Sequence, residues 1–327
     1  MAAATCLPGL NPAAYAPHFL HGSQRNWPET NCYVDLWIEI LSSMGLQPEA
    51  ALGFTVTQDF EGDQFTFFKF PPEDLAALFG LSVQELAIYD RVESHTFEQV
   101  QRGRLVLIEV DSHYLPDTGG VSYQLTHGKT TIGVNHLDTG RRVLHYFHNA
   151  GFFELSGADY DGIFRQPYTA GSAQAALFPY VEFVKNASRK PAAVTHGLAI
   201  KLLKHHLLSR PANNPMRAFQ QGFPAHAEQL AQRPMDFFHV YAFNTLRQIG
   251  ANFEMLGSHL SWLATLGEKN LESGISAANE IAASAKTIQF QLARAVARKK
   301  FDSFVAGLEP LAVAYDAVFA ALAPYCD

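Results

Sequence analysis

The sequence is short of charged side chains and of cysteine. Asp, Glu, Lys and Arg make up 17% of its 327 residues, below the quarter that is usual in globular proteins. This low charge, with 48% hydrophobic residues, excludes a disordered chain and predicts a sizeable folded core. The three cysteines, Cys6, Cys32 and Cys326, are too few for a disulfide framework and favour a reducing, cytoplasmic location.

Long apolar runs and basic blocks are also missing. No stretch approaches 18 uninterrupted apolar residues, and the N-terminus has no basic segment followed by an apolar one. We therefore expect neither a membrane span nor a signal peptide. The net charge is -7, and the short run Arg298-Lys299-Lys300 is typical of a solvated helix face. Nucleic acid and membranes are therefore not expected as partners.

Motifs for metals and nucleotides are absent as well. The sequence has no HExxH, CxxC, GxGxxG or Walker-type loop, so we expect no metal and no cofactor. Three histidines, His136, His145 and His148, fall in one predicted hairpin, but the last two have opposite parity on a strand. The pair His205-His206 is expected at the solvated end of a helix.

The first half of the chain mixes helix and strand signals. Residues 31–44 have helical apolar spacing, with Thr30 as the expected N-cap and Gly45 as the stop. Further elements are predicted from composition and periodicity. They are a strand-like aromatic segment at 51–70, helices at 71–78 and 82–89, a strand at 104–116, and a hairpin with strands at 129–137 and 142–150.

From about residue 170 onward, strand signals give way to long segments with helical spacing. The predicted fold class is therefore α+β, with an α+β domain over residues 1–168 and an all-helical domain over residues 169–327.

Cys32 lies in the first turn of the predicted 31–44 helix, two residues after Thr30. A helix N-terminus favours the thiolate, because unpaired N–H groups and partial positive charge stabilise it. The alternative is that Cys32 is a small buried hydrophobic residue. Papain-type catalysis also needs a base and a group that orients it. His127 opens the first hairpin strand and Asn149 closes its partner, so we expect the two side chains to be neighbours.

The segments NCYVDLWIEIL, LIEVDSHYLPD, YQLTHGKTTIGV and YFHNAGFFEL resemble a bacterial papain-like family that is associated with amino acid:carrier-protein ligases. More distantly, their layout is similar to the N-terminal domain of the butirosin aminoacyltransferases and to the double-glycine cysteine peptidases. The close resemblance covers roughly residues 20–165. It implies a papain-like catalytic domain in the first part of the chain, followed by the helical domain.

Carried over by position, the resemblance implies Cys32 as nucleophile, His127 as base and Asn149 as orienting residue. Peptidases of this layout carry Asp-Pro at the orienting position, whereas this chain has His148-Asn149-Ala150, with His148 as the second choice. The oxyanion donors are expected to be the Cys32 N–H with a side chain from Gln24 or Asn31.

Three further residues have two interpretations each. Asp111 recurs in the wider layout and could bind the ammonium of an aminoacyl group, or it could cap the turn that follows. Arg247 and Glu254 share one face of a long predicted helix. They could form a buried ion pair between helices, or they could contact the substrate.

The resulting hypothesis is a cysteine-dependent acyltransferase. It would take an aminoacyl group from a carrier-protein thioester through a Cys32 acyl-enzyme to a small-molecule acceptor. A peptidase, amidase or thioesterase with the same triad, and an idle binding protein of this fold, are the alternatives. Because the chain is acidic, carrier docking would need a local basic patch. The candidates for that patch are Arg102, Arg104, Lys129, Arg141 and Arg142.

Overall fold

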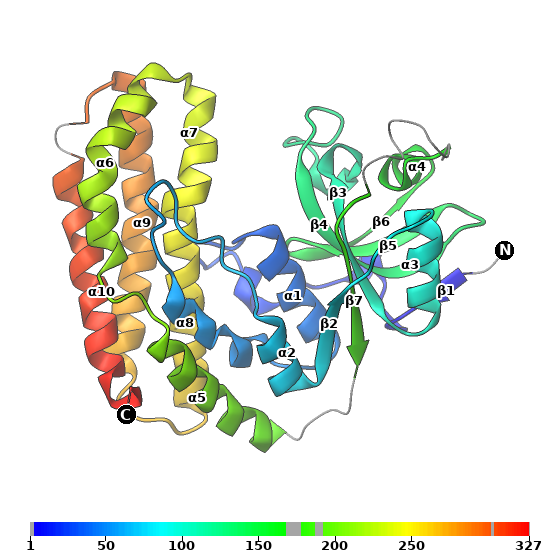
Figure 1. The fold of residues 1–327 in the computed structure, drawn as a ribbon, viewed down its shortest axis with the longest axis horizontal. Helices are drawn as coiled ribbons and strands as arrows, with labels where there is room; N and C mark the ends of the chain where they lie inside the picture. Colours follow the sequence, from blue (N-terminus) through cyan, green and yellow to red (C-terminus); the bar gives the residue numbers. More distant parts are fainter. Residues whose placement is uncertain (1–2, 168–177, 187–191, 302–303, 327) are drawn as a thin grey trace. The chain divides into compact units, whose positions relative to one another are not determined.

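The computed structural model describes residues 3–167, 178–186, 192–301 and 304–326 (Figure 1). The chain forms two structural units, each built from separate stretches of sequence. Unit 1 comprises Met1–Gly22, Asn31–Gln47 and Leu75–Arg189; unit 2 comprises Ser23–Thr30, Pro48–Asp74 and Lys190–Asp327. The single division predicted between residues 168 and 169 is therefore replaced by units that share the first part of the chain.

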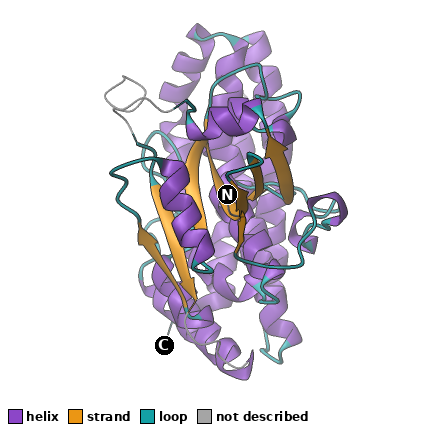
Figure 2. Cartoon of the chain, turned by 90° about the vertical axis from the view of Figure 1, so that its right-hand side faces the viewer, coloured by secondary structure: helices purple, strands orange, loops and turns teal. Residues whose placement is uncertain are grey.

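Unit 1 is an α+β unit around an antiparallel sheet, whose strands are orange in Figure 2. The described strands are β1 (Ala3–Thr5), β2 (Leu81–Glu85), β3 (Leu105–Asp111), β4 (Lys129–Asp138), β5 (Val143–His148), β6 (Gly151–Ser156) and β7 (Val181–Asn186). Their order across the sheet is β2-β7-β3-β4-β5-β6, and β1 pairs with the end of β4. The predicted strand at 104–116 and the predicted hairpin are confirmed as β3, β4 and β5.

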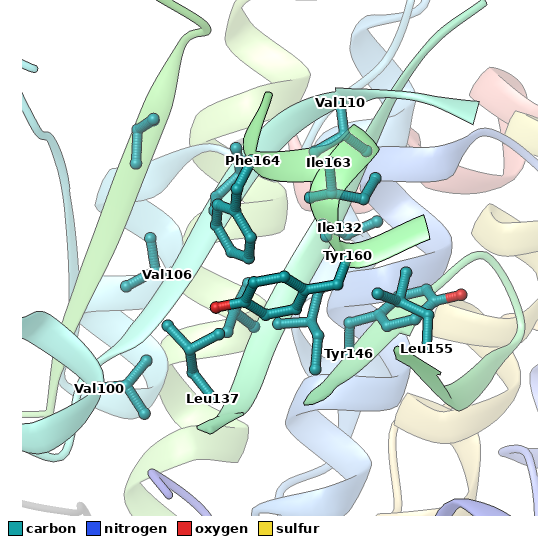
Figure 3. Packing of buried hydrophobic residues seen from close by; sticks show 14 of the residues in the cluster. Val100, Val106, Val110, Ile132, Leu137, Tyr146, Leu155, Tyr160, Ile163 and Phe164 are labelled. Carbon is teal, nitrogen blue, oxygen red and sulfur yellow. The ribbon is translucent and has the colours of Figure 1, made fainter. Parts of the chain in front are cut away.

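One face of this sheet carries the apolar cluster of Figure 3, to which helices α3 (Val92–Gln101) and α4 (Ala158–Phe164) contribute. Ile132 of β4 lies opposite Ile108 of β3. Tyr160 of α4 is fully buried in the same cluster. These apolar positions alternate along the strands with residues that point to the opposite face. This alternation of apolar and other residues, with a period of two, allowed the hairpin to be predicted from the sequence.

Helix α1 (Cys32–Ser43) packs against the opposite face. Gly133 of β4 makes that close approach possible, because a Cβ there would lie 3.0 Å from Ile40 Cδ1. Every residue from Tyr33 to Leu41 is buried, so α1 is covered on all sides. A helix buried all round is unusual in a small unit, and its polar side chains must find partners.

Three predicted elements were wrong. Residues 82–89, expected as a helix, begin as strand β2. The chain after residue 170, expected to be all helical, contains β7, which lies between β2 and β3. Pairing on both sides satisfies the backbone groups of β7 and overrides its helical spacing. Residues 48–57 form a 3₁₀ helix, η3 (Pro48–Thr57), where a strand had been expected.

Unit 2 is helical, as expected for the C-terminal half. Its main helices are α5 (Ala192–Leu208), α6 (Pro215–Gln232), α7 (Met235–Ala242), α8 (Gln248–Thr265), α9 (Glu272–Arg298) and α10 (Glu309–Leu322). A π turn, η7 (Phe243–Arg247), joins α7 to α8. Helices α6, α9 and α10 run side by side (Figure 1). Helix α2 (Pro72–Phe79), which was predicted, contains the boundary between the units in sequence.

One stretch in the described part of the chain, Val305–Tyr325, is long and apolar enough to cross a membrane by length and composition, with a mean hydropathy of 1.5. It contains α10, which packs against α9 and α6. Glu309 and Asp316 lie within it and both accept hydrogen bonds from Arg217 of α6. The two hydrogen-bonded carboxylates and the contacts with α6 and α9 are typical of a helix that packs in a helical bundle.

Trp27 anchors the segment Ser23–Thr30 within unit 2. Its indole N–H donates to the Ala282 carbonyl at 3.0 Å, and the Lys286 ammonium lies 4.3 Å from the ring centroid. Gly250 leaves room for the ring, since a Cβ there would lie 2.3 Å from Trp27 Nε1. Packing at this site therefore depends on the missing side chain of Gly250.

We expect Gly250→Ala to lower the free energy of unfolding by about 1–3 kcal/mol, because the added methyl overpacks a filled site. Urea denaturation measures the change. Gly197→Ala is the matched control, because Gly197 is also helical and nothing lies within 4 Å of its added Cβ. The control should gain about 0.5–1 kcal/mol from lower chain entropy in the unfolded state. Equal effects of the two substitutions would contradict the packing argument.

Candidate functional site

Cys32 is the first residue of α1. The N-cap is Asn31, whose side-chain oxygen accepts from the Val34 N–H at 3.0 Å, so the expectation that Thr30 caps the helix was wrong. Cys32 is a free, half-buried thiol. It lies in the first turn of the helix, one residue after the N-cap.

His127 lies in the turn before β4 and is paired with Asp111, the last residue of β3. Its Nδ1–H donates to Asp111 Oδ2 at 2.6 Å. The His127 side chain is 71% exposed, and its ring stacks on His113 with centroids 4.4 Å apart. A carboxylate on Nδ1 fixes the tautomer that leaves Nε2 as the proton acceptor.

Asp111 also caps the turn that follows it, which confirms one of the two interpretations of this residue. Its Oδ1 accepts from the backbone N–H groups of His113 at 3.0 Å and Gly128 at 3.1 Å. Burial alone would raise the pKa of Asp111, but these bonds and the one from His127 outweigh burial and hold that pKa below its ordinary value. Asp111 is therefore a fixed carboxylate that orients His127.

The register places this pair and α1 on the same side of the sheet. Asp111 lies four residues beyond Leu107 on β3, so their side chains share a face. Leu107 is opposite Gly133, which Ile40 of α1 contacts. Within the described residues, the Cys32 thiol makes no hydrogen bond to His127. Helix α1, which begins at Cys32, and the His127–Asp111 pair thus lie on one side of the sheet.

Asn149 lies in a different local setting from the predicted one. It begins the two-residue turn that joins His148 of β5 to Gly151 of β6, with φ of 44°. Asn tolerates this left-handed conformation better than most residues, so the turn explains its presence. In the part of the chain that the structure describes, Asp111 is the partner of His127 at Nδ1, and Asn149 is not.

His148 is buried in a polar network that the sequence analysis missed. Its Nδ1 bonds to Asp117 Oδ2 at 2.5 Å, and its Nε2 bonds to Thr130 Oγ1 at 2.8 Å. Asp117 Oδ1 accepts from the Tyr146 hydroxyl at 2.5 Å. The side chains of His148 and Asp117 are 2% and 4% exposed. His148 is the last residue of the largely buried strand β5, and a histidine at such a position needs hydrogen-bond partners.

A second buried network holds the N-terminal segment to α1. His21 bonds through Nδ1 to Glu39 and through Nε2 to Asp35, the latter at 3.3 Å. The Tyr15 hydroxyl donates to Glu39 Oε2 at 2.5 Å. Burial alone would lower the pKa of His21, but Asp35 and Glu39 outweigh it and raise it to about 9. Two carboxylates four residues apart in an apolar helix were the missed signal.

Arg247 and Glu254 hold the segment before Asn31 and do not pair with each other. Arg247 donates from Nε to the Thr30 carbonyl at 3.0 Å and from Nη2 to the Glu29 carbonyl at 2.9 Å. These contacts lie within unit 2. Neither residue pairs with the other: Arg247 lies 3.8 Å from the Glu29 carboxylate, and Glu254 lies 3.7 Å from Arg25. The alternative, a contact with the substrate, stays a prediction.

Glu254 accepts from two backbone groups of the same segment. Its oxygens bind the N–H of Asn26 at 2.9 Å and the N–H of Trp27 at 2.8 Å, and Arg25 lies 3.7 Å away. Gln24, a predicted oxyanion donor, is exposed in this segment. Arg247 and Glu254 together satisfy backbone groups that an irregular segment cannot pair by itself.

The remaining histidines and basic residues have ordinary partners. His136 and His145 face each other across β4 and β5, whereas His148 points to the other face. Among the described residues, no group of three His, Cys, Asp or Glu side chains is placed to hold a metal ion. His205 is exposed as expected, but His206 bonds to Asp74 at 2.7 Å.

Most of the predicted basic patch is neutralised. Four of its five side chains have hydrogen-bonded partners: Lys129 with Glu109, Arg142 with Asp161, Arg102 with Glu98, and Arg104 with Gln99. Arg141 is exposed. The partners of the other four weaken the case for a basic docking surface.

The His21 network predicts a stability that depends on pH. The pKa of His21 is raised from 6.5 to about 9 on folding, so its contribution is fully present below pH 6.5 and is lost as pH rises through about 9. The contribution is on the order of 3 kcal/mol. The unfolding free energies of the protein and of His21→Gln should differ most near pH 6 and converge towards pH 10. His205→Gln, at an exposed site, should show no such convergence, and a pH-independent difference for His21→Gln would contradict the assignment.

Comparison with known families accounts for most of the chain. Residues 16–186 match the DUF1839 N-terminal domain, and residues 193–324 match the DUF1839 C-terminal domain. The chain therefore belongs to the DUF1839 family. Among curated proteins, no sequence matches it.

Proposed function

We propose that this member of the DUF1839 family is a cysteine-dependent acyltransferase with a papain-like unit 1. Cys32 would be the nucleophile, His127 the base and Asp111 the orienting residue. Asp111 takes the role that the sequence analysis gave to Asn149. The donor would be an aminoacyl thioester on a carrier protein, and the acceptor a small-molecule amine.

The observation that carries this proposal is the hydrogen bond of 2.6 Å between His127 and Asp111. An oriented, solvent-accessible imidazole with Nε2 free to accept a proton is the part of a catalytic triad that is hardest to explain as packing. The His127 side chain is 71% exposed, so the pair contributes little to the core. The pair lies on the side of the sheet against which α1 packs, and Cys32 is the first residue of that helix.

The chemistry follows from these groups. His127 Nε2 would take the thiol proton of Cys32, and the thiolate would attack the thioester carbonyl. The pantetheine thiolate would leave and take the proton from the imidazolium. An amine would then attack the Cys32 thioester, forming an amide and returning the thiol. Because one thioester replaces another in the first half, little free energy is lost there.

Two arguments support a carrier protein as the donor's partner. One is the resemblance to a family associated with amino acid:carrier-protein ligases, and the other is the ease of exchange between two thioesters. With Lys129 and Arg142 bonded to carboxylates, docking would depend on Arg141 or on apolar contacts. We also propose a cytoplasmic location, because all three cysteines are free thiols. No cofactor beyond the pantetheine of the donor is needed by these steps.

Hydrolysis is the second candidate, and the exposure of His127 favours it. Water can reach an imidazole that is 71% exposed, and a transferase must exclude water from its acyl-enzyme. If no acceptor competes with water, the same residues would make a thioesterase.

The test is mass spectrometry of the intact protein after incubation with an aminoacyl-pantetheine thioester. We expect one acyl group on Cys32, and its loss when an amine is added. Cys32→Ala should abolish the adduct, and His127→Ala should slow its formation at least about 1000-fold. Asp111→Asn should slow it by roughly 100-fold, because it leaves the imidazole without its orienting charge.

Asn149→Ala is the matched comparison for Asp111→Asn. Near-normal acylation of Asn149→Ala supports Asp111 as the orienting residue, and the reverse order of effects would restore Asn149. Labelling of Cys6 or Cys326 in place of Cys32, or full activity of His127→Ala, would refute the proposal. Loss of the acyl group to water at the same rate with and without amines would identify a thioesterase.

A further inference from the structure

We infer that Thr130, His148 and Asp117 form a positioning network for the His127–Asp111 pair, an inference that rests on the proposed function. The three side chains form a continuous chain of hydrogen bonds: Thr130 Oγ1 to His148 Nε2 at 2.8 Å, and His148 Nδ1 to Asp117 Oδ2 at 2.5 Å. A hydroxyl, an imidazole and a carboxylate in this order have the connectivity of a hydrolytic triad. Burial decides against that role, because Thr130 is 7% exposed and cannot meet a large substrate.

The network is attached to the segment that carries His127. Residues 112–128 leave β3 after Asp111 and return to β4, and the neck is closed by the Ser112 N–H donating to the Gly128 carbonyl at 2.8 Å. Asp117 lies in the middle of this segment. Its two carboxylate oxygens bind His148 and Tyr146, both on β5. The segment is thus fixed at its neck and at its centre.

Where the two ends of this segment meet, three hydrogen bonds hold the Asp111 carboxylate and lower its pKa. Asp111 accepts from the N–H groups of His113 and Gly128 and from His127. All three donors belong to the segment 112–128. If Asp117 were released from β5, the segment would gain freedom, and these three bonds would be formed for less of the time. His127 would then lose its fixed orientation.

Thr130 affects the network through its hydrogen bond to the His148 ring, which fixes the tautomer and orientation of that ring. The Asp117 carboxylate accepts from Nδ1–H, which leaves Nε2 as the acceptor for the Thr130 hydroxyl. Removing that hydroxyl would leave a buried ring nitrogen without a partner, which costs about 1–3 kcal/mol. The bond from Nδ1 to Asp117 would be weakened with it, since both bonds depend on the same ring orientation.

The structure supplies a matched pair of variants. Thr130→Val keeps the shape of the side chain and removes the hydroxyl, and Thr130→Ser keeps the hydroxyl and removes the methyl. His145→Gln is the control, because His145 lies on the same strand as His148, points to the opposite face and bonds to Glu154 at 2.8 Å. These substitutions avoid the buried imidazole itself, whose removal could prevent folding.

Two measurements are made on each folded variant. The first is the pKa of the Asp111 carboxyl, followed by ¹³C NMR. The second is the rate at which an aminoacyl-pantetheine thioester acylates Cys32. We expect Thr130→Val to raise the pKa of Asp111 towards its ordinary value and to slow acylation by roughly 10-fold. Thr130→Ser and His145→Gln should leave both quantities close to those of the unmodified protein.

Each outcome decides the inference. Unchanged values in Thr130→Val, or equal damage in Thr130→Val and Thr130→Ser, would overturn it, because the first shows no coupling and the second shows an effect of packing. If the unmodified protein is not acylated at all, the proposed function fails, yet the pKa of Asp111 still shows whether the network positions the pair. A raised Asp111 pKa in Thr130→Val alone would then support the positioning role by itself.

Discussion

Unit 1 depends on the requirement that a carboxylate removed from water must be paired. Asp111, Asp117 and the two carboxylates of α1 each bond to a histidine. Leaving the buried carboxylates of Asp117 or α1 unpaired would cost several kcal/mol, so each of these pairs fixes the elements that supply it. Asp111 is 34% exposed and is held by its three hydrogen bonds. One pair joins β3 to the turn before β4, another joins the 112–128 segment to β5, and the third joins the N-terminal segment to α1. The three pairs connect segments that the sheet alone would leave loose.

These pairs differ in exposure, and that difference separates the two buried histidines from the proposed base. The His148 and His21 rings are buried and have partners on both nitrogens. His127 is exposed, and among the described residues it forms a hydrogen bond through Nδ1 alone. A histidine with a fixed orientation and one nitrogen open to solvent can exchange protons with a substrate, whereas a fully bonded one cannot. The proposed base is thus the histidine that the fold orients without enclosing.

The segment before Cys32 is ordered by a comparable rule applied to the backbone. Residues 23–30 have no regular structure, so their N–H and carbonyl groups need partners from elsewhere. Glu254 and Arg247 of unit 2 supply acceptor and donor groups, respectively. The sequence analysis placed both residues on one helix face and could not assign their partners, because backbone groups leave no pattern in a sequence. The contact between Trp27 and Gly250 could not be predicted from sequence either. The need for glycine at position 250 becomes visible only when the Trp27 ring is seen to occupy the space of its side chain.

The sequence by itself determined the strands β3, β4 and β5, the helix α1 with Cys32 in its first turn, and the helical character of the C-terminal half. These features follow from local periodicity and helix-end chemistry, which act over a few residues. Tertiary structure decided the rest. Residues 181–186 became a strand because β2 and β3 lie on either side of them. His127 bonds to Asp111 because the end of β3 and the start of β4 are adjacent in the sheet. Asn149 lies instead in the turn between β5 and β6. Pairing across the sheet joins residues far apart in the chain, and no local pattern encodes which carboxylate a histidine will meet.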